Sequence, residues 1–243
     1  MAGHSKWNNI KHRKGRQDEK RGKLFTKISK EIYQAVRTGG ENPETNLALR
    51  AALDKAKQVN MPKDNIDRTI KKATGGLDGV DYEHVVYEGY GPAGTAVYVE
   101  ALTENRNRTA AEIRLAFNKN GGSLGENGCV SFMFARRGRL ILEAEQPIDE
   151  EELLLLVLEA GGDDMQVSEQ TVYIETDPAS LDNVRGQMKQ LDGITIAEAE
   201  AAMIPDVMVE LDNDKAEQAA ALIEALEDSD DVQHVYHNAD FMP

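Results

Sequence analysis

The first third of the chain has apolar residues at helical spacing. A helix is predicted where apolar side chains recur every three or four positions, at Leu24, Phe25, Ile28, Ile32 and Val36. A second helix is predicted to start with Asn42 as its N-cap and Pro43 in its first turn. A third should begin at Pro62 and end at the glycine pair that starts with Gly75. Together they predict a three-helix domain over residues 24–79.

After residue 80 the pattern changes to short β-branched and aromatic runs that alternate with helical ones. Strands are predicted over Val85–Tyr90, Thr95–Leu102, Val130–Phe134, Gly138–Glu143, Met165–Ser168, Val172–Glu175, Thr195–Ala201, Val207–Leu211 and Val232–His237. Helices are predicted over Thr109–Lys119, Asp149–Ala160, Ser180–Leu191 and Asp214–Leu226. This order is typical of two ferredoxin-like sandwiches, each with helices on one face of an antiparallel sheet. The predicted fold class is therefore α+β, with three domains.

The order of elements also suggests how the chain is divided. Residues 132–205 contain a complete β-α-β-β-α-β unit, and we expect them to be inserted in the other α+β domain. Residues 80–131 and 206–243 would then join as that discontinuous domain, and residues 1–23 would form a basic N-terminal arm. The alternative is three consecutive domains with a boundary near residue 160.

Charge is distributed very unevenly along the 243 residues. The whole chain has 28 Lys and Arg against 43 Asp and Glu, for a net charge of −15, which excludes a generally basic nucleic-acid-binding protein. Residues 1–74 nevertheless carry +10, whereas residues 140–243 carry −24. Such a basic block indicates an interaction arm whose partner is a polyanion.

Other features exclude several classes of protein. The single cysteine, Cys129, excludes an internal disulfide framework and a thiolate metal cluster, and it fits a reducing, cytoplasmic location. The longest apolar run, Leu153–Leu158, is far shorter than the roughly 20 residues of a membrane span, so no membrane partner is expected. We expect that the protein holds neither a metal nor a cofactor. We also expect it to be a monomer.

Motifs for catalysis or nucleotide binding are weak. The G-x-G-x-x-G match at Gly89–Gly94 continues into a predicted strand instead of opening a helix, so it is interpreted as a hairpin turn. His234 and His237 would lie on opposite faces of a strand, which is unsuitable for a shared metal. No nucleophile, base and orienting group come together, and Cys129 is interpreted as a small core residue. We therefore predict that the protein is not an enzyme, with catalysis kept as a third hypothesis.

The strongest functional signal is the basic N-terminal region, which also contains the only tryptophan. Its cations can neutralise phosphates, and an indole or imidazole can stack on an unpaired base. In the predicted first helix, the lysines fall on the face opposite the apolar residues and should face solvent. The alternative is a solubilising tail. The predicted nucleic-acid-binding residues are Lys6, Trp7, Lys11, His12, Arg13, Lys14, Arg16, Lys20, Arg21, Lys23, Lys27 and Lys30.

A second cluster comprises Asn105, Arg106, Asn107 and Arg108, just before a predicted helix that Asn107 or Thr109 would cap. Two arginines at a helix N-terminus oppose the helix dipole unless an anion neutralises them. The partner is either an external phosphate, which we expect, or carboxylates from the acidic half of the chain. The Gly121–Gly128 loop is expected at the other end of that helix, about 16 Å away at 1.5 Å per residue, so it is predicted to form a separate contact or hinge.

Several of these segments also resemble those of one family. The segments Ala2–Trp7, Arg21–Lys27, Tyr87–Pro92, Asn105–Thr109, Gly121–Gly125 and Asp231–Asn238 are similar to those of the YebC family. This family includes the mitochondrial translational activator of cytochrome oxidase. The resemblance covers residues 1–238 and implies a cytoplasmic protein with one helical and two α+β domains, without a known catalytic site or cofactor.

The resemblance and the charge pattern both imply a nucleic-acid partner. Family members are described as DNA-binding transcriptional regulators, and others resemble ribosome-associated factors that help the synthesis of difficult peptides such as proline runs. We therefore expect a regulator of gene expression that binds DNA. The alternative is a translation factor that binds rRNA or tRNA on the ribosome. No recognition helix can be identified from the sequence, and no small-molecule substrate is expected.

Overall fold

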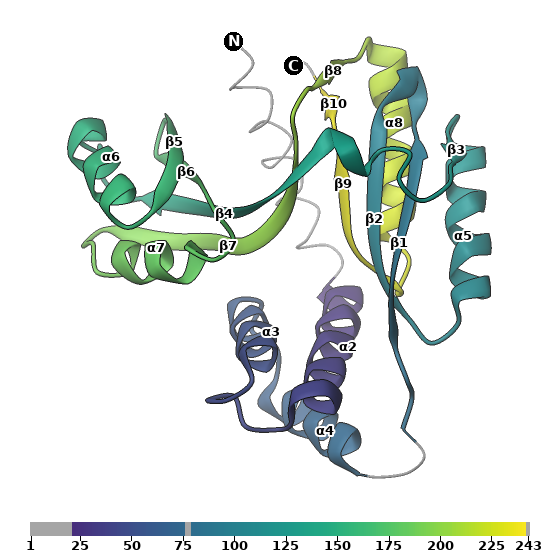
Figure 1. Cartoon of the computed structure of the whole chain (residues 1–243), viewed down its shortest axis with the longest axis horizontal. Helices are drawn as coiled ribbons and strands as arrows, with labels where there is room; N and C mark the ends of the chain where they lie inside the picture. The colour runs from purple at the N-terminus through teal and green to yellow at the C-terminus, as the bar shows by residue number, and fades with distance from the viewer. Residues whose placement is uncertain (1–20, 76–78, 242–243) are drawn as a thin grey trace. The chain divides into compact units, whose positions relative to one another are not determined.

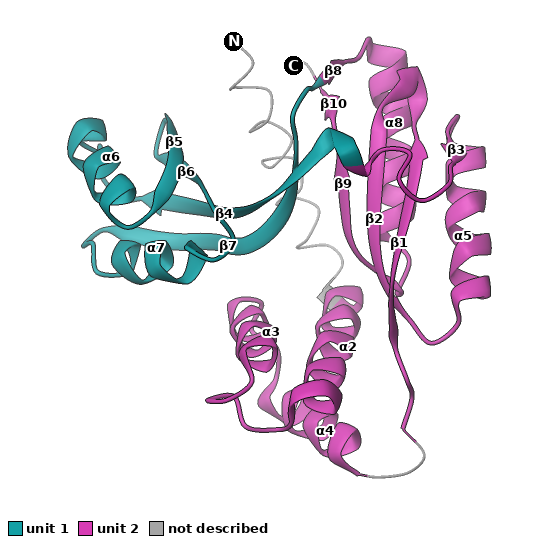
Figure 2. Ribbon diagram, in the orientation of Figure 1, with its two compact units in different colours: residues 1–7, 132–208 teal, residues 8–131, 209–243 magenta. Residues whose placement is uncertain are grey.

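The computed structural model describes residues 21–75 and 79–241. By contacts within the chain, it divides into two compact units (Figures 1 and 2). One unit is formed by residues 132–208, and the other by the described residues on either side of them. No helix in the described parts of the chain is both long and apolar enough to cross a membrane.

Three helices form the N-terminal part of the larger unit: α2 (Arg21–Gly39), α3 (Leu47–Gln58) and α4 (Lys63–Thr74). The long first helix packs against both of the others. The predicted apolar face of α2 supplies the centre of this core, where Ile32 is fully buried against Leu49 and Ala56 of α3. Hydrophobic burial thus holds together three helices that would be marginal alone.

The predicted start of the second helix was wrong by several residues. Asn42 caps a turn, not a helix: its Oδ1 accepts a hydrogen bond from the backbone N–H of Glu44. The true N-cap is Asn46, whose Oδ1 accepts from the N–H of Leu49 at 3.0 Å. The Asn46 amide also donates to the carbonyls of Ala35 and Gly40, so it ties α3 to the end of α2. An isolated Asn-Pro signal cannot show which of two nearby asparagines is used.

The rest of the larger unit is an α+β sandwich. Its sheet has the order β3-β1-β2-β9, and all neighbouring strands are antiparallel. The elements are β1 (Glu83–Tyr90), β2 (Ala96–Thr103), α5 (Arg106–Lys119), β3 (Ser123–Leu124), α8 (Asn213–Glu227) and β9 (Val232–His237). A short 3-10 turn over Pro92–Gly94 joins β1 to β2, as expected for a hairpin.

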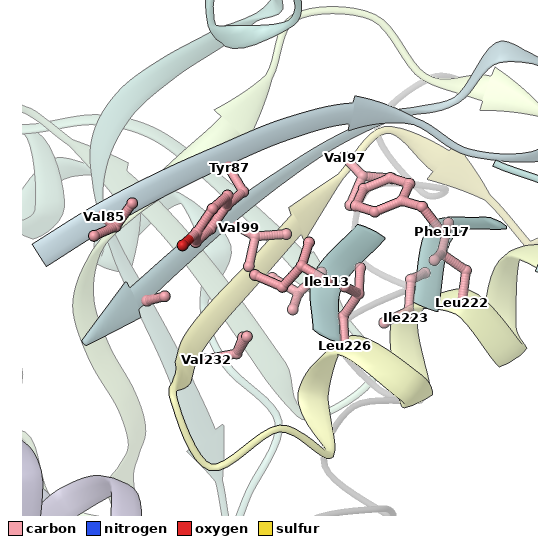
Figure 3. Close-up of a cluster of buried hydrophobic side chains, with 12 residues drawn as sticks. Val85, Tyr87, Val97, Val99, Ile113, Phe117, Leu222, Ile223, Leu226 and Val232 are labelled. Atoms are coloured by element: carbon pink, nitrogen blue, oxygen red, sulfur yellow. The ribbon is translucent and has the colours of Figure 1, made fainter. Parts of the chain in front are cut away.

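The core of this sandwich lies between the sheet and its two helices. Figure 3 shows Ile113 and Phe117 of α5 beside Leu222 and Leu226 of α8, with the valines of the sheet next to them. Phe117 is completely buried, and Gly89 lies so close that an added Cβ would be 2.8 Å from its ring. The alternation of apolar residues in β1 and β2 therefore marks the face that the helices cover.

The smaller unit, residues 132–208, is a second sandwich with the element order β-α-β-β-α-β. Its sheet has the order β5-β6-β4-β7, with antiparallel neighbours throughout. The elements are β4 (Phe134–Ala144), α6 (Glu150–Glu159), β5 (Gly162–Ser168), β6 (Thr171–Thr176), α7 (Leu181–Met188) and β7 (Ile194–Pro205). Together with the helical region and the first sandwich, this confirms the predicted α+β fold class.

Two predicted strands were placed incorrectly. The strand predicted over Val130–Phe134 contains a 3-10 turn at Ser131–Met133, whereas the strand predicted over Gly138–Glu143 lies within the long strand β4. Strand β4 begins at Phe134 and includes Arg136 and Arg137, which both pair with β7. The strand predicted over Val207–Leu211 is only β8 (Val209–Glu210), which pairs in parallel with β10 (Ala239–Asp240) in a separate sheet.

A buried carboxylate organises the loop that follows β3. Glu88 in β1 is 4% exposed, and its side chain accepts hydrogen bonds from the backbone N–H groups of Gly128, Val130 and Ser131 at 2.7–2.8 Å. Burial favours a higher pKa for this carboxyl, but the three hydrogen bonds outweigh it and lower the pKa below its usual value. The glycine-rich loop, predicted to be a separate contact or hinge, is thus fixed to the first sheet.

Replacing Glu88 with Gln should destabilise the protein by about 1–3 kcal/mol, because an amide presents an NH₂ group where three N–H donors converge. Urea unfolding measures this loss. Glu126→Gln is the matched control, since Glu126 lies in the same loop and is exposed. Equal stability of the two variants would show that Glu88 does not hold the loop.

Candidate nucleic-acid interface

The predicted nucleic-acid-binding residues fall into two groups. Lys6, Trp7, Lys11, His12, Arg13, Lys14, Arg16 and Lys20 lie outside the described residues. Arg21 is the first residue of α2, and Lys23, Lys27 and Lys30 follow it on the same helix. The structure therefore gives the side-chain contacts of these three lysines.

The prediction that the α2 lysines face solvent holds for Lys23, which is exposed, but is corrected for the partly buried Lys27 and Lys30. Lys23 and Lys27 donate to the backbone carbonyls of Asp228 and Glu227, at 3.1 and 2.6 Å. These carbonyls lie at the C-terminal end of α8, where the helix dipole favours cations. The helical spacing did place the lysines on one face, but periodicity does not reveal what covers that face.

Lys30 reaches the centre of a buried polar cluster. Its Nζ lies 2.6 Å from Oδ1 of Asp231 and also donates to the carbonyl of Asp230. The other carboxylate oxygen of Asp231 accepts from Arg108 Nη2 and from Thr109 Oγ1, both at 2.8 Å, and from Thr103 Oγ1 at 3.2 Å. Asp231 therefore joins α2 to β2 and α5 through one carboxylate.

The electrostatics of Asp231 follow from this arrangement. The Asp231 side chain is only 5% exposed, and burial by itself would raise its pKa. Hydrogen bonds from Arg108, Lys30 and Thr109 outweigh the burial and lower the pKa of Asp231 from 3.8 to about 2. The carboxylate is thus charged at neutral pH and is paired with two cations.

The two arginines of the second predicted cluster form ion pairs with carboxylates of this chain. Besides Asp231, Arg108 contacts Glu104 at 3.4 Å, and Arg106 Nε lies 3.7 Å from Glu83. Asn105, not Asn107 or Thr109, is the N-cap of α5, because its Oδ1 accepts from the N–H of Arg108. These contacts give Arg108 a structural role, while a phosphate at the exposed Arg106 and Asn107 stays a prediction.

A cationic group on α4 was missed by the sequence analysis. Arg68, Lys71 and Lys72 are exposed, and their spacing of three and four residues places them on one face of this helix. Lys72 Nζ also lies 6.0 Å from the centroid of the Tyr33 ring. The i, i+3, i+4 spacing is present in the sequence, but the denser run of cations before residue 31 is the stronger charge signal.

The net charges of the two described regions differ in sign. Residues 21–75 contain twelve basic and six acidic side chains, for a net charge of +6. Residues 132–208 contain five basic and seventeen acidic side chains, for a net charge of −12. A polyanion is therefore attracted to the helical region and repelled by the smaller unit.

Cys129 is the only thiol in the sequence. Burial, together with the negative charge of Glu88, raises the pKa of the Cys129 thiol, which disfavours the nucleophilic thiolate. Among the described residues, no group of three or more His, Cys, Asp or Glu side chains is arranged to hold a metal ion.

Replacing Asp231 with Asn should destabilise the protein by about 3–5 kcal/mol at pH 7, because it removes the charge that compensates Lys30 and Arg108. The folded-state pKa is lowered, so the stabilisation is complete above about pH 4 and is lost as the pH falls toward 2. Thermal unfolding from pH 7 to pH 2 should therefore show the difference between wild type and Asp231→Asn shrinking below pH 4. The exposed neighbour Asp230 provides the control Asp230→Asn, which should match wild type. A difference that does not change with pH would contradict a charged, paired Asp231.

Comparisons with known proteins agree with this organisation. The chain matches the model of the TACO1/YebC protein N-terminal domain over residues 5–76 and the model of the TACO1/YebC second and third domain over residues 82–239. A probable transcriptional regulatory protein of Geobacillus kaustophilus is 53% identical over 241 residues, which cover 99% of this chain and 98% of the relative. A probable transcriptional regulatory protein of Bacillus subtilis is 52% identical over 239 residues, covering 98% and 99%.

One solved structure has a similar fold. The crystal structure of a conserved hypothetical protein from Aquifex aeolicus is similar, with a TM-score of 0.81 and 45% sequence identity over 91% of each chain. The resemblance inferred from the sequence motifs is confirmed by these matches, and this chain belongs to the TACO1/YebC family.

Proposed function

We propose that this protein is a non-enzymatic, nucleic-acid-binding regulator of gene expression. Its basic N-terminal region, residues 1–75, would carry the binding, and the exposed cations of α4 would contribute to it. The observation that carries the proposal is the separation of charge between the +6 helical region and the −12 unit of residues 132–208. A solubilising role alone does not require such a separation.

The contacts of the described residues indicate which cations are available to bind phosphates. Lys27 and Lys30 contact carbonyls and Asp231, so using them on a nucleic acid would break these interactions. Arg68 and Lys71 of α4 are exposed, and side chains of this type bind phosphates as point charges or bidentate donors. The proposed interface therefore consists of residues 1–20 of the N-terminal arm together with the C-terminal half of α4.

The names of the relatives support a regulatory role, because the two relatives described above are probable transcriptional regulatory proteins. DNA is thus the first target to test. The strongly acidic unit of residues 132–208 favours the second candidate, the ribosome, because a ribosome offers basic protein surfaces beside RNA.

The proposal predicts a steep salt dependence of binding. Fluorescence anisotropy with labelled duplex DNA and with an rRNA fragment should show affinity falling by about two orders of magnitude or more between 50 and 200 mM salt. In Arg68→Gln/Lys71→Gln, the slope of log K against log salt should decrease by about 1–2, because two phosphate contacts are lost. Deletion of residues 2–20 should reduce affinity further.

Arg114→Gln/Lys119→Gln is the matched control, since it removes the same two charges from exposed positions on α5. It should bind like wild type. Equal weakening in both double variants would indicate net charge alone and would contradict an interface on α4. Tight binding to ribosomes with weak binding to DNA would select the second candidate.

A further inference from the structure

Helix α6 in the smaller unit is apolar on almost every side. Its sequence, Glu150–Glu159, has acidic residues in the first turn and then six consecutive apolar residues. Leu153 and Val157 are buried in the core of the sandwich, which is the expected position for one face of the helix. An apolar residue elsewhere on such a helix normally has a partner.

The other leucines of α6 have no such cover. Leu154, Leu155, Leu156 and Leu158 are 37%, 63%, 36% and 49% exposed. At about 100° per residue, Leu154, Leu158 and Leu155 follow one another around the surface opposite the core. Leu154, Leu155 and Leu158 form a continuous apolar strip, named here the α6 strip. Glu151 and Glu159, both exposed, border it.

The charge around the α6 strip limits what can cover it. In a symmetric contact between two copies, the bordering glutamates would face the equally acidic surface of the other copy, since each unit carries −12. Nucleic acids and anionic lipid surfaces are repelled for the same reason. A partner that places Lys or Arg beside apolar side chains satisfies both the leucines and the glutamates.

We propose that the α6 strip is a docking site for a basic, amphipathic protein segment, with apolar side chains on the leucines and cations on Glu151 and Glu159. Exposed apolar strips bordered by polar residues commonly mark protein-protein contacts. A helix that lays its apolar face on this strip is the simplest form of such a segment. The site is independent of the proposed nucleic-acid interface, because it lies in the other unit.

A defined probe tests the proposal without nucleic acid. A fluorescein-labelled, helical 14-residue peptide of only Leu and Lys, with the leucines on one face, is titrated with the full-length protein at 150 mM NaCl. Leu155→Gln/Leu158→Gln should weaken binding by about tenfold or more without a change in net charge. Glu151→Gln/Glu159→Gln should weaken binding and reduce its salt dependence.

Leu115→Gln is the matched control, because Leu115 of α5 is similarly exposed (53%) but lies outside the strip. It should bind the peptide like wild type. The melting temperatures of all variants should be unchanged, since the replaced side chains point away from the core.

Three results would overturn the proposal. Equal binding by wild type and Leu155→Gln/Leu158→Gln would show attraction by general acidity only. Equal binding of a peptide with Glu in place of Lys would show apolar adhesion without charge recognition. A wild-type dimer in sedimentation velocity that Leu155→Gln/Leu158→Gln dissociates would identify the occupant as a second copy.

Discussion

Within the larger unit, the connection between α2 and the first sandwich depends on the buried carboxylate of Asp231. It accepts hydrogen bonds from Lys30, Arg108, Thr103 and Thr109, so it joins a helix of the N-terminal region to a strand and a helix of the first sandwich. A buried charge is costly unless it is fully paired, and a fully paired one fixes the positions of its partners. Asp231 therefore determines how α2 meets the rest of this unit.

This arrangement changes the role of the basic residues. Lys23 and Lys27 stabilise the C-terminal end of α8, and Lys30 and Arg108 neutralise Asp231. Cations that a charge count assigns to nucleic acid thus contribute to the fold. The exposed cations of α4 and those of the N-terminal arm carry the proposed binding, while the α6 strip with its bordering Glu151 and Glu159 is the proposed site for a basic protein segment.

Much of the fold was predictable because it follows from local patterns. Apolar spacing identified α2, α4 and α8, and the β-α-β-β-α-β order identified the ferredoxin-like sandwich. The errors occurred where a local signal had two solutions. Asn42 and Asn46 are both suitable caps, and only the contacts of Asn46 with the end of α2 decide between them.

The candidate site was less predictable than the fold, because its contacts join residues far apart in sequence. Lys30 and Asp231 are 201 positions apart, and no periodicity links them. The sequence indicated that Arg108 needs an anion, but it did not identify Asp231 as that anion. Likewise, the run Leu153–Leu158 identified a helix without showing which leucines would stay exposed.

The most direct test of the division between structural and binding cations is lysine reactivity. Acetylation of each lysine can be followed by mass spectrometry with and without bound nucleic acid. The lysines of residues 1–20 and Lys71 should react readily in the free protein and become protected in the complex. Lys27 and Lys30 should react slowly in both states, because they are already hydrogen-bonded. Fast reaction of Lys27 and Lys30 in the free protein, with protection only on binding, would contradict the structural role assigned to them.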